Sequence, residues 1–317
     1  MGASEIFRNL SPLDHRYYLS NKQLFDSLRT YLSEEATILY CARAEIALLE
    51  THIHFLFDDR KDLAKKMENI ESLITPEEVY EEEEKTNHNI RALVNVIKRK
   101  LPDELSPYVH LGATSVDILD TAFSMRMRDA TRLVVLPLLL DLEEALVDLC
   151  ASQAENPQIG RTHGQHAVPI TVGFAFAEYV ARLGKSIREI ETRSADLRGK
   201  LSGAVGAYNA TSVVVSDPLA LEAHYLALLG LKPSEISTQL VEPEYLLRLL
   251  LEMNIAFGII ANLADDLRNL QRSEILEVQE LFAAEQVGSS TMPQKRNPWN
   301  SEHVKSLWKA SLSSIST

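Results

Sequence analysis

The sequence predicts an all-α protein built from long helices, and three observations support that prediction. Leu, Ala and Glu are abundant, and such residues lose little conformational freedom when they enter a helix. Gly and Pro, which interrupt helices, number only 12 each among 317 residues. No stretch shows the alternation of apolar and polar residues that is typical of half-buried strands.

Two helices are predicted in the first hundred residues. Residues 21–57 repeat apolar side chains at three- and four-residue steps, which predicts one long helix followed by a turn at residues 58–61. Thr75 can cap a second helix, and Pro76 suits its first position. That helix should run to about Lys100.

The middle of the chain continues the helical pattern. Thr114 precedes another helix with Asp117 at the capping-box distance, and the pattern persists to about residue 155. Residues 133–140 are apolar, and a buried helix segment explains this short run better than a membrane span does. Residues 159–172 carry one charge, two glycines and a proline, so we expect a loop that enters a buried helix.

Residues 246–281 are apolar around most of a helix circumference, as expected for a helix in the middle of a bundle. A loop follows Phe282, and another helix begins near Ser301. The chain is long for one domain. We expect an N-terminal helical domain, residues 1–106, and a long-helix bundle, residues 107–317.

Charge and cysteine content restrict the partners and the compartment. The formal charge is −13, and an acidic chain repels phosphate backbones, so we expect no nucleic-acid partner. Cys41 and Cys150 are the only cysteines, which favours a reducing compartment without disulfides. No apolar run reaches 18 residues and no signal-peptide pattern opens the chain. We therefore expect a cytoplasmic protein with no membrane association.

Several common kinds of site are absent from the sequence. No glycine-rich loop follows a predicted strand, which excludes a dinucleotide fingerprint and a phosphate-binding P-loop. His52 and His54 are two residues apart, so they do not share a helix face and form a poor metal pair. No Gly-x-Ser-x-Gly nucleophile turn occurs. We expect neither a metal nor an organic cofactor.

Three segments collect small polar donors and charges beside helix-breaking residues: Gly112–Thr121, Gly160–Pro169 and Gly288–Pro298. Loops and helix starts of this kind often hold anions. The third segment can be a lid with Gly288 as its hinge and Lys295 as a charge for a carboxylate. It can equally be a surface loop with a helix cap.

The other candidate residues also have ordinary structural explanations. His163 and His166 are compatible with hydrogen-bonded histidines of a half-buried loop. His88 is compatible with a surface histidine on a helix. Thr114 and Ser115 suit plain N-capping, which does not conflict with ligand binding. The residues alone leave these alternatives open.

The third segment resembles the signature loop of the fumarase/aspartase superfamily, whose core is Ser-Ser-x-Met-Pro-x-Lys-x-Asn. Every defining position is present between Ser289 and Asn297. Residues 112–121 and 160–169 resemble two other motif regions of the superfamily, in the same order. The resemblance implies an all-α fold with a central bundle of long helices.

Within the superfamily the sequence is most similar to the adenylosuccinate lyase family. The similarity lies in segments Ser11–Tyr17, Thr86–Asn89, Thr238–Gln239 and Leu270–Glu274. Three places depart from the pattern: Asn89 stands where the family usually has Asp, His303 stands where some relatives have Arg, and the residues after Gln239 lack the arginine that many relatives place nearby. Family members continue through another central helix and a third helical domain, and we expect this chain to lack them.

The resemblance implies an elimination that releases fumarate from a small nucleotide, in a homotetramer with shared active sites. It implies Ser289 as the base, His163 as the acid that protonates the leaving nitrogen, and Glu302 as a group that orients His163. The implied substrate-binding residues are Arg16, Tyr17, Asn87, His88, Asn89, Thr114, Ser115, Thr162, Gln239, Lys295 and Asn297. Among them, Arg16 and Tyr17 would hold the phosphate, and Lys295 and Asn297 the succinyl carboxylates.

Two other interpretations remain. One is a different fumarate-releasing lyase of the argininosuccinate type, although Arg16 and Tyr17 favour a phosphorylated substrate. The other is a truncated, inactive helical scaffold. The presence of His163, Ser289 and Lys295 favours an enzyme.

Overall fold

The computed structural model describes residues 8, 10–58, 60–67, 69–282, 291–292 and 294–315. Their packing divides the chain into two compact units. The first comprises residues 1–135 and 193–246, and the second comprises residues 136–192 and 247–317. The expected domain division at residues 106 and 107 stays a prediction.

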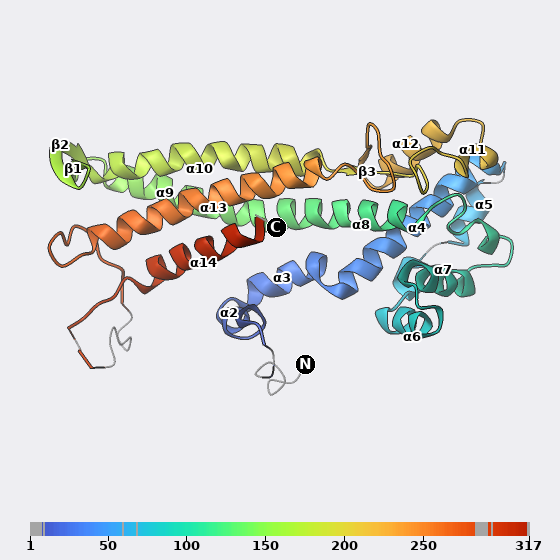
Figure 1. Ribbon diagram of the computed structural model, residues 1–317, viewed down its shortest axis with the longest axis horizontal. Helices are drawn as coiled ribbons and strands as arrows, with labels where there is room; N and C mark the ends of the chain where they lie inside the picture. Colours follow the sequence, from blue (N-terminus) through green and yellow to red (C-terminus); the bar gives the residue numbers. More distant parts are fainter. Residues whose placement is uncertain are drawn as a thin grey trace. The chain divides into compact units, whose positions relative to one another are not determined.

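The predicted all-α fold is confirmed, because helices dominate and the strands are few and short (Figure 1). The first unit contains η1 (Pro12–Asp14), α2 (Arg16–Ser20), α3 (Lys22–Leu32), α4 (Glu34–Leu56), α5 (Arg60–Lys65), η2 (Glu71–Leu73), α6 (Pro76–Thr86), α7 (Asn89–Lys100), η3 (Ser106–Tyr108), α8 (Ser115–Ala130), η4 (Thr131–Val135), β3 (Arg198–Gly199), α11 (Thr211–Val214), α12 (Pro218–Leu228) and β4 (Lys232–Pro233). The second unit contains α9 (Leu136–Ser152), β1 (Pro157–Thr162), β2 (Gln165–Thr171), most of α10 (Val172–Ala195), most of α13 (Glu244–Leu270) and α14 (Trp299–Ile315).

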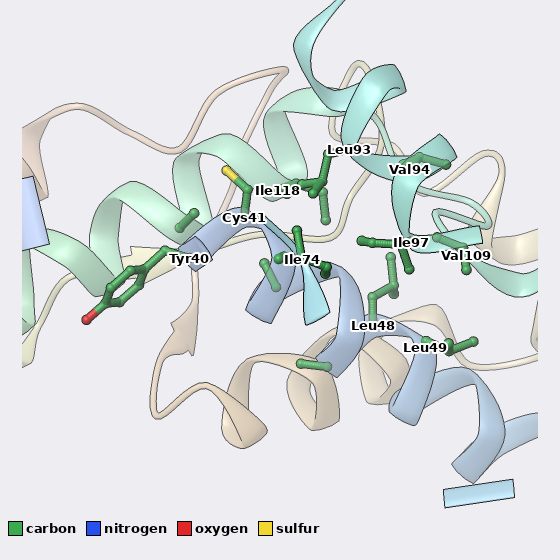
Figure 2. Packing of buried hydrophobic residues seen from close by; sticks show 14 of the residues in the cluster. Tyr40, Cys41, Leu48, Leu49, Ile74, Leu93, Val94, Ile97, Val109 and Ile118 are labelled. Atoms are coloured by element: carbon green, nitrogen blue, oxygen red, sulfur yellow. The ribbon is translucent and has the colours of Figure 1, made fainter. Parts of the chain in front are cut away.

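Helix α4 runs through the core of the first unit and contacts α6, α7, α8 and α12. Figure 2 shows apolar side chains from these helices gathered in that core, among them Leu48, Ile97 and Ile118. Cys41 belongs to the same cluster. Burial raises the pKa of its thiol to about 12, so the group stays protonated and acts as a small apolar side chain.

Two predicted helices of the first unit are each broken in two. The single helix expected over residues 21–57 is wrong, because Ser33 leaves the helical conformation and its hydroxyl caps α4 by accepting from the Ala36 N–H at 3.1 Å. The single helix expected from Pro76 to Lys100 is also wrong, because Asn87 adopts a left-handed φ of 50°. The expected start at Thr75 and Pro76 is confirmed. The turn expected over residues 58–61 is wrong in its last two positions, since α5 begins at Arg60.

The helices of the second unit run antiparallel to their neighbours. The Tyr179 hydroxyl of α10 donates to Asp266 of α13, and further along Ser186 donates to Glu252 at 2.7 Å. Helix α14 returns along α13, with Lys305 paired to Asp265 at 2.5 Å. The unit is therefore an up-and-down bundle of long helices, as the sequence predicts.

The loop expected over residues 159–172 is instead an antiparallel hairpin of β1 and β2, followed by the predicted helix α10. Its turn has two residues, His163 and Gly164, with φ values of 55° and 74°. A two-residue hairpin turn with left-handed residues at both positions matches the natural twist of the strands. Thr162 pairs with Gln165 directly before and after this turn.

Helix α13 ends at Leu270, so the helical pattern expected to residue 281 is wrong in its last eleven positions. The bundle helices expose many apolar side chains in the single chain, which include Leu138, Leu140, Leu247, Leu251 and Ile255. An 18-residue window of α13 has a mean hydropathy of 1.6 and is 28% buried. Helix α13 is long and apolar enough to cross a membrane. These two properties are weak evidence for a membrane span, because central bundle helices share them.

Candidate functional site

The start of α8 presents Thr114 and Ser115 and is fixed by buried charges. Asp117 forms a capping box with Thr114, whose N–H donates to the Asp117 carboxylate at 2.8 Å. The same carboxylate accepts from the Lys200 ammonium, and both side chains are fully buried. It also accepts from the Gly203 N–H at 3.2 Å. One buried carboxylate therefore joins the helix start to the loop that follows β3.

The segment with Gln239 is tied to this region. The Ser202 and Ser237 hydroxyls hydrogen-bond at 2.6 Å, and the Val241 N–H donates to Asp120 of α8 at 2.8 Å. Burial raises the pKa of the Asp120 carboxyl, and the Val241 hydrogen bond opposes that shift. The structure thus anchors the segment carrying Gln239 on the first turns of α8.

The predicted residues Asn87, His88 and Asn89 form an exposed corner between α6 and α7. The His88 Nδ1 accepts from the Arg91 N–H at 3.2 Å, which makes His88 the cap of α7. The Asn89 Oδ1 accepts from the Ile90 N–H at 2.7 Å. The ordinary interpretation of His88 as a surface histidine on a helix therefore fits the structure, because the exposed ring caps the start of α7.

Arg16 and Tyr17 open the short helix α2, directly after η1. Ser11 caps η1 by accepting from the Leu13 N–H at 3.2 Å. Arg16 is exposed and Tyr17 is half-buried. Their cationic and hydroxyl groups are therefore available at a helix start, the kind of place where phosphate binds.

The hairpin turn presents His163 at its exposed tip, directly after Thr162. The strands are held by Arg161, whose guanidinium donates to both carboxylate oxygens of Glu277; one of these bonds is 3.0 Å long. The Gln158 amide donates to the same carboxylate at 2.9 Å. Histidine tolerates the left-handed region better than most residues, which suits this position.

A cavity of about 630 Å³ in the second unit collects the predicted residues Lys295, Asn297 and Glu302. Arg268, Arg272 and Arg296 also line it, and none of the three is among the predicted site residues. Arg268 lies in the last turn of α13, whereas Arg272 lies two residues beyond its end at Leu270, so helical spacing could not have paired them. The excess of cations makes the cavity suitable for a dianion.

Some of the predicted site lies outside the described residues. Ser289 and the proposed hinge Gly288 belong to residues 283–290, which the structure does not describe. Within the described part of the chain, no group of three or more His, Cys, Asp or Glu side chains could hold a metal ion. The expected absence of a cofactor stays a prediction.

Comparisons with known proteins identify the family. A family model described as "Lyase" matches residues 13–309. The chain belongs to this lyase family. Adenylosuccinate lyase of Pyrococcus abyssi is 34% identical over 309 residues, which cover 96% of this chain and 66% of that protein. Adenylosuccinate lyase of Archaeoglobus fulgidus is 34% identical over 300 residues, and the match covers 93% of this chain and 64% of that protein. The chain thus spans just under two thirds of the length of these relatives.

Solved structures support the fold of the lyase family. A fumarate lyase from Mesorhizobium sp. BNC1 matches with a TM-score of 0.75 at 22% identity, over 92% of this chain and 64% of that one. The 3-carboxy-cis,cis-muconate lactonizing enzyme from Pseudomonas putida matches with a TM-score of 0.75 at 24% identity, over 92% of this chain and 65% of that one. At this identity the likeness concerns the fold alone.

Proposed function

We propose that this lyase cleaves adenylosuccinate to AMP and fumarate, and cleaves the related succinyl-aminoimidazole-carboxamide ribotide of purine synthesis in the same way. The main support for this substrate is the 34% identity to the curated adenylosuccinate lyase of Pyrococcus abyssi over nearly the whole chain. The geometry supports it independently, because the cavity around Lys295 and Asn297 is rich in cations and the succinyl group is a dianion.

The reaction needs a base, an acid and stabilisation of negative charge. The proton to be removed lies next to a carboxylate and is weakly acidic, so its loss creates an aci-carboxylate dianion. Lys295 and Asn297 would stabilise that charge. Removal of the proton from one carbon and loss of the amine from the adjacent carbon then form the double bond of fumarate.

His163 would protonate the leaving nitrogen, and Ser289 would accept the proton from carbon. Serine is a poor base in water, so this role requires a closed loop that excludes water and surrounds the oxygen with cations. Glu302 would orient the His163 ring and favour its protonated form. Arg16 and Tyr17 would hold the phosphate, while Asn87, His88, Asn89, Thr114, Ser115, Thr162 and Gln239 would contact the remaining polar groups of the substrate.

Oligomerisation would bring these groups together. His163 and the corner at residues 87–89 are exposed in the single chain, and the bundle helices expose apolar faces. Exposed apolar faces of long helices are what a shared helical bundle buries. We therefore propose a homotetramer whose active sites combine residues from different copies. Sedimentation velocity would contradict this if the chain stayed monomeric at micromolar concentration.

The decisive experiment measures fumarate release from adenylosuccinate by the unaltered chain and two serine variants. Loss of a positioned base costs on the order of 10²–10⁴ in rate, so Ser289→Ala should lose most activity. Ser290→Ala is the matched control and should keep it. If Ser290→Ala lost activity and Ser289→Ala kept it, the base would be Ser290, and the proposed reaction would still hold. Turnover of argininosuccinate but not of adenylosuccinate would refute the proposed substrate.

A further inference from the structure

The ten residues after α13, Gln271–Glu280, form an irregular segment that holds three parts of the second unit. It begins where the helix ends, and the Glu277 N–H donates to the Leu270 carbonyl at 3.0 Å. The Glu280 N–H donates to the Gln271 amide oxygen at 2.8 Å. These two bonds close the segment on the end of α13.

The segment then reaches outward through three side chains. Glu277 holds the hairpin through Arg161 and Gln158. The Gln271 amide donates to the Arg296 carbonyl at 3.2 Å, between Lys295 and Asn297.

Glu280 accepts from the Ser301 N–H at 3.0 Å, at the start of the helix that carries Glu302. The hairpin, the residues around Lys295 and the start of α14 are therefore all fixed to one anchor.

We propose that Glu277 is a positioning residue for His163. Its carboxylate accepts two hydrogen bonds from Arg161 and thereby sets the orientation of the hairpin tip. The inference rests on the proposed function, in which His163 is the acid. Arg161 is two residues before His163, and its side chain is only 20% exposed. A bidentate pair fixes the guanidinium plane as well as its distance, so it restrains rotation of the strand that enters the turn.

The protonation state of Glu277 supports this role. The hydrogen bond from Arg161 lowers the pKa of the Glu277 carboxyl, and the Gln158 hydrogen bond acts in the same direction. The group is therefore a carboxylate at neutral pH and keeps both acceptor oxygens. Replacement by glutamine removes the charge and converts one acceptor into a donor that faces the guanidinium.

The experiment compares Glu277→Gln with Glu178→Gln, which breaks a more exposed Arg–Glu pair on α10. A displacement of about 1 Å at a catalytic group can cost on the order of 10²-fold in rate. Glu277→Gln should therefore lower kcat about 10- to 100-fold and change KM much less, since the hairpin tip carries the proposed acid but only one of the proposed substrate contacts, Thr162. Glu178→Gln should match the unaltered enzyme in both constants.

Hydrogen–deuterium exchange gives a readout that does not depend on turnover. Amides of residues 157–171 should exchange about tenfold faster in Glu277→Gln, because a charge-assisted restraint is lost. Those of Glu178→Gln should not change. If the unaltered enzyme fails to cleave adenylosuccinate, the proposed function fails and this measurement still decides whether Glu277 restrains the hairpin.

Two results would overturn the proposal. One is normal kcat in Glu277→Gln, and the other is unchanged exchange at residues 157–171. If Glu277→Gln does not fold, Arg161→Lys takes its place, because lysine keeps the charge but cannot form the bidentate pair. That variant should show a smaller loss of kcat in the same direction, and unaltered kcat would equally contradict the role.

Discussion

The start of α8 and the tip of the β1–β2 hairpin both present predicted site residues, but they are held by different kinds of interaction. Asp117 and Lys200 are fully buried beneath Thr114 and Ser115. Arg161 and Glu277 retain 20% and 25% exposure behind His163. In the first region the buried ion pair holds the first unit together. In the second the partly exposed ion pair only orients a short hairpin next to the helical bundle.

This difference teaches where substitution damages stability and where it damages chemistry. A buried charge that loses its partner remains without solvent, so the whole unit is destabilised. A partly exposed charge that loses its partner is rehydrated, so the unit survives and only local geometry is lost. The first region should therefore reveal itself in unfolding experiments and the second in kinetics.

The largest expected effect is that of Lys200→Met, which leaves Asp117 buried and unpaired. We expect the free energy of unfolding to fall by about 3–5 kcal/mol. Arg161→Met should cost about 1 kcal/mol or less, because its partner stays accessible to water. Urea denaturation followed by circular dichroism measures both values. Equal losses of unfolding free energy in the two variants would contradict the proposed difference between the buried and the partly exposed ion pair.

A smaller effect is expected from Gly206→Ala. Gly206 has a φ of 78°, and an added Cβ would come 2.8 Å from the Ser237 carbonyl carbon and would overlap its oxygen. Left-handed backbone alone costs about 1–2 kcal/mol, and the overlap adds displacement of the segment that carries Gln239. Gly203→Ala is the matched control, since its φ is 82° and its added Cβ would meet nothing within 4 Å. Equal costs would show that the contact with Ser237 is unimportant.

Lowering the pH should destabilise the segment that precedes α8, around Leu111, and should leave the stability of the hairpin unchanged. Burial lowers the pKa of His52 below its ordinary 6.5, against the opposing bond between its Nε2 and the Leu111 carbonyl. A depressed folded-state pKa means that this contribution to stability is present above pH 6.5. It is lost as pH falls through the folded value.

Hydrogen exchange at residues 111–117 should therefore accelerate as the pH is lowered, after correction for intrinsic rates. His52→Gln, which can still donate to Leu111 and does not titrate, should remove the part of the pH dependence of stability that His52 contributes. An identical pH dependence in both proteins would exclude His52 as the cause.

The smallest effect on stability is expected from His163→Asn at the hairpin tip. Asparagine accepts left-handed φ values, and the side chain is exposed, so the unfolding free energy should change by less than about 0.5 kcal/mol. Fumarate release should nevertheless fall on the order of 10²-fold or more, because asparagine cannot act as the acid. If His163→Asn lowered the unfolding free energy as much as Lys200→Met, His163 would instead have a structural role.

The sequence predicted the long helices well, because their apolar spacing reflects burial along many turns. It also located the starts at Thr75 and Thr114, where a single side chain caps the backbone. The break at Ser33 was missed, since apolar spacing continues across it and only that residue departs from helical φ and ψ. The break at Asn87 and His88 was missed because the charged residues before it favour a helix, and nothing in the spacing marks the two residues that leave it.

The hairpin was missed for a related reason. Its strands face the surface for much of their length and do not alternate, so the period-two signal is weak. The His163-Gly164 pair, preceded by the β-branched Thr162, was the one readable signal for a two-residue turn. Lys200 and Glu277 could not be found by spacing, because their partners lie 83 and 116 positions away in the chain.

The pairing of β1 with β2 has a further consequence. Ile159 pairs with Pro169, whereas Arg161 pairs with His166, so the second strand holds one residue more than the first between these pairs. Side chains on a strand alternate between its two faces, and deleting or inserting one residue there would turn Arg161 away from Glu277. In this hairpin the number of residues is constrained as strictly as their chemistry, and evolution can exchange its surface side chains far more freely than it can change its length.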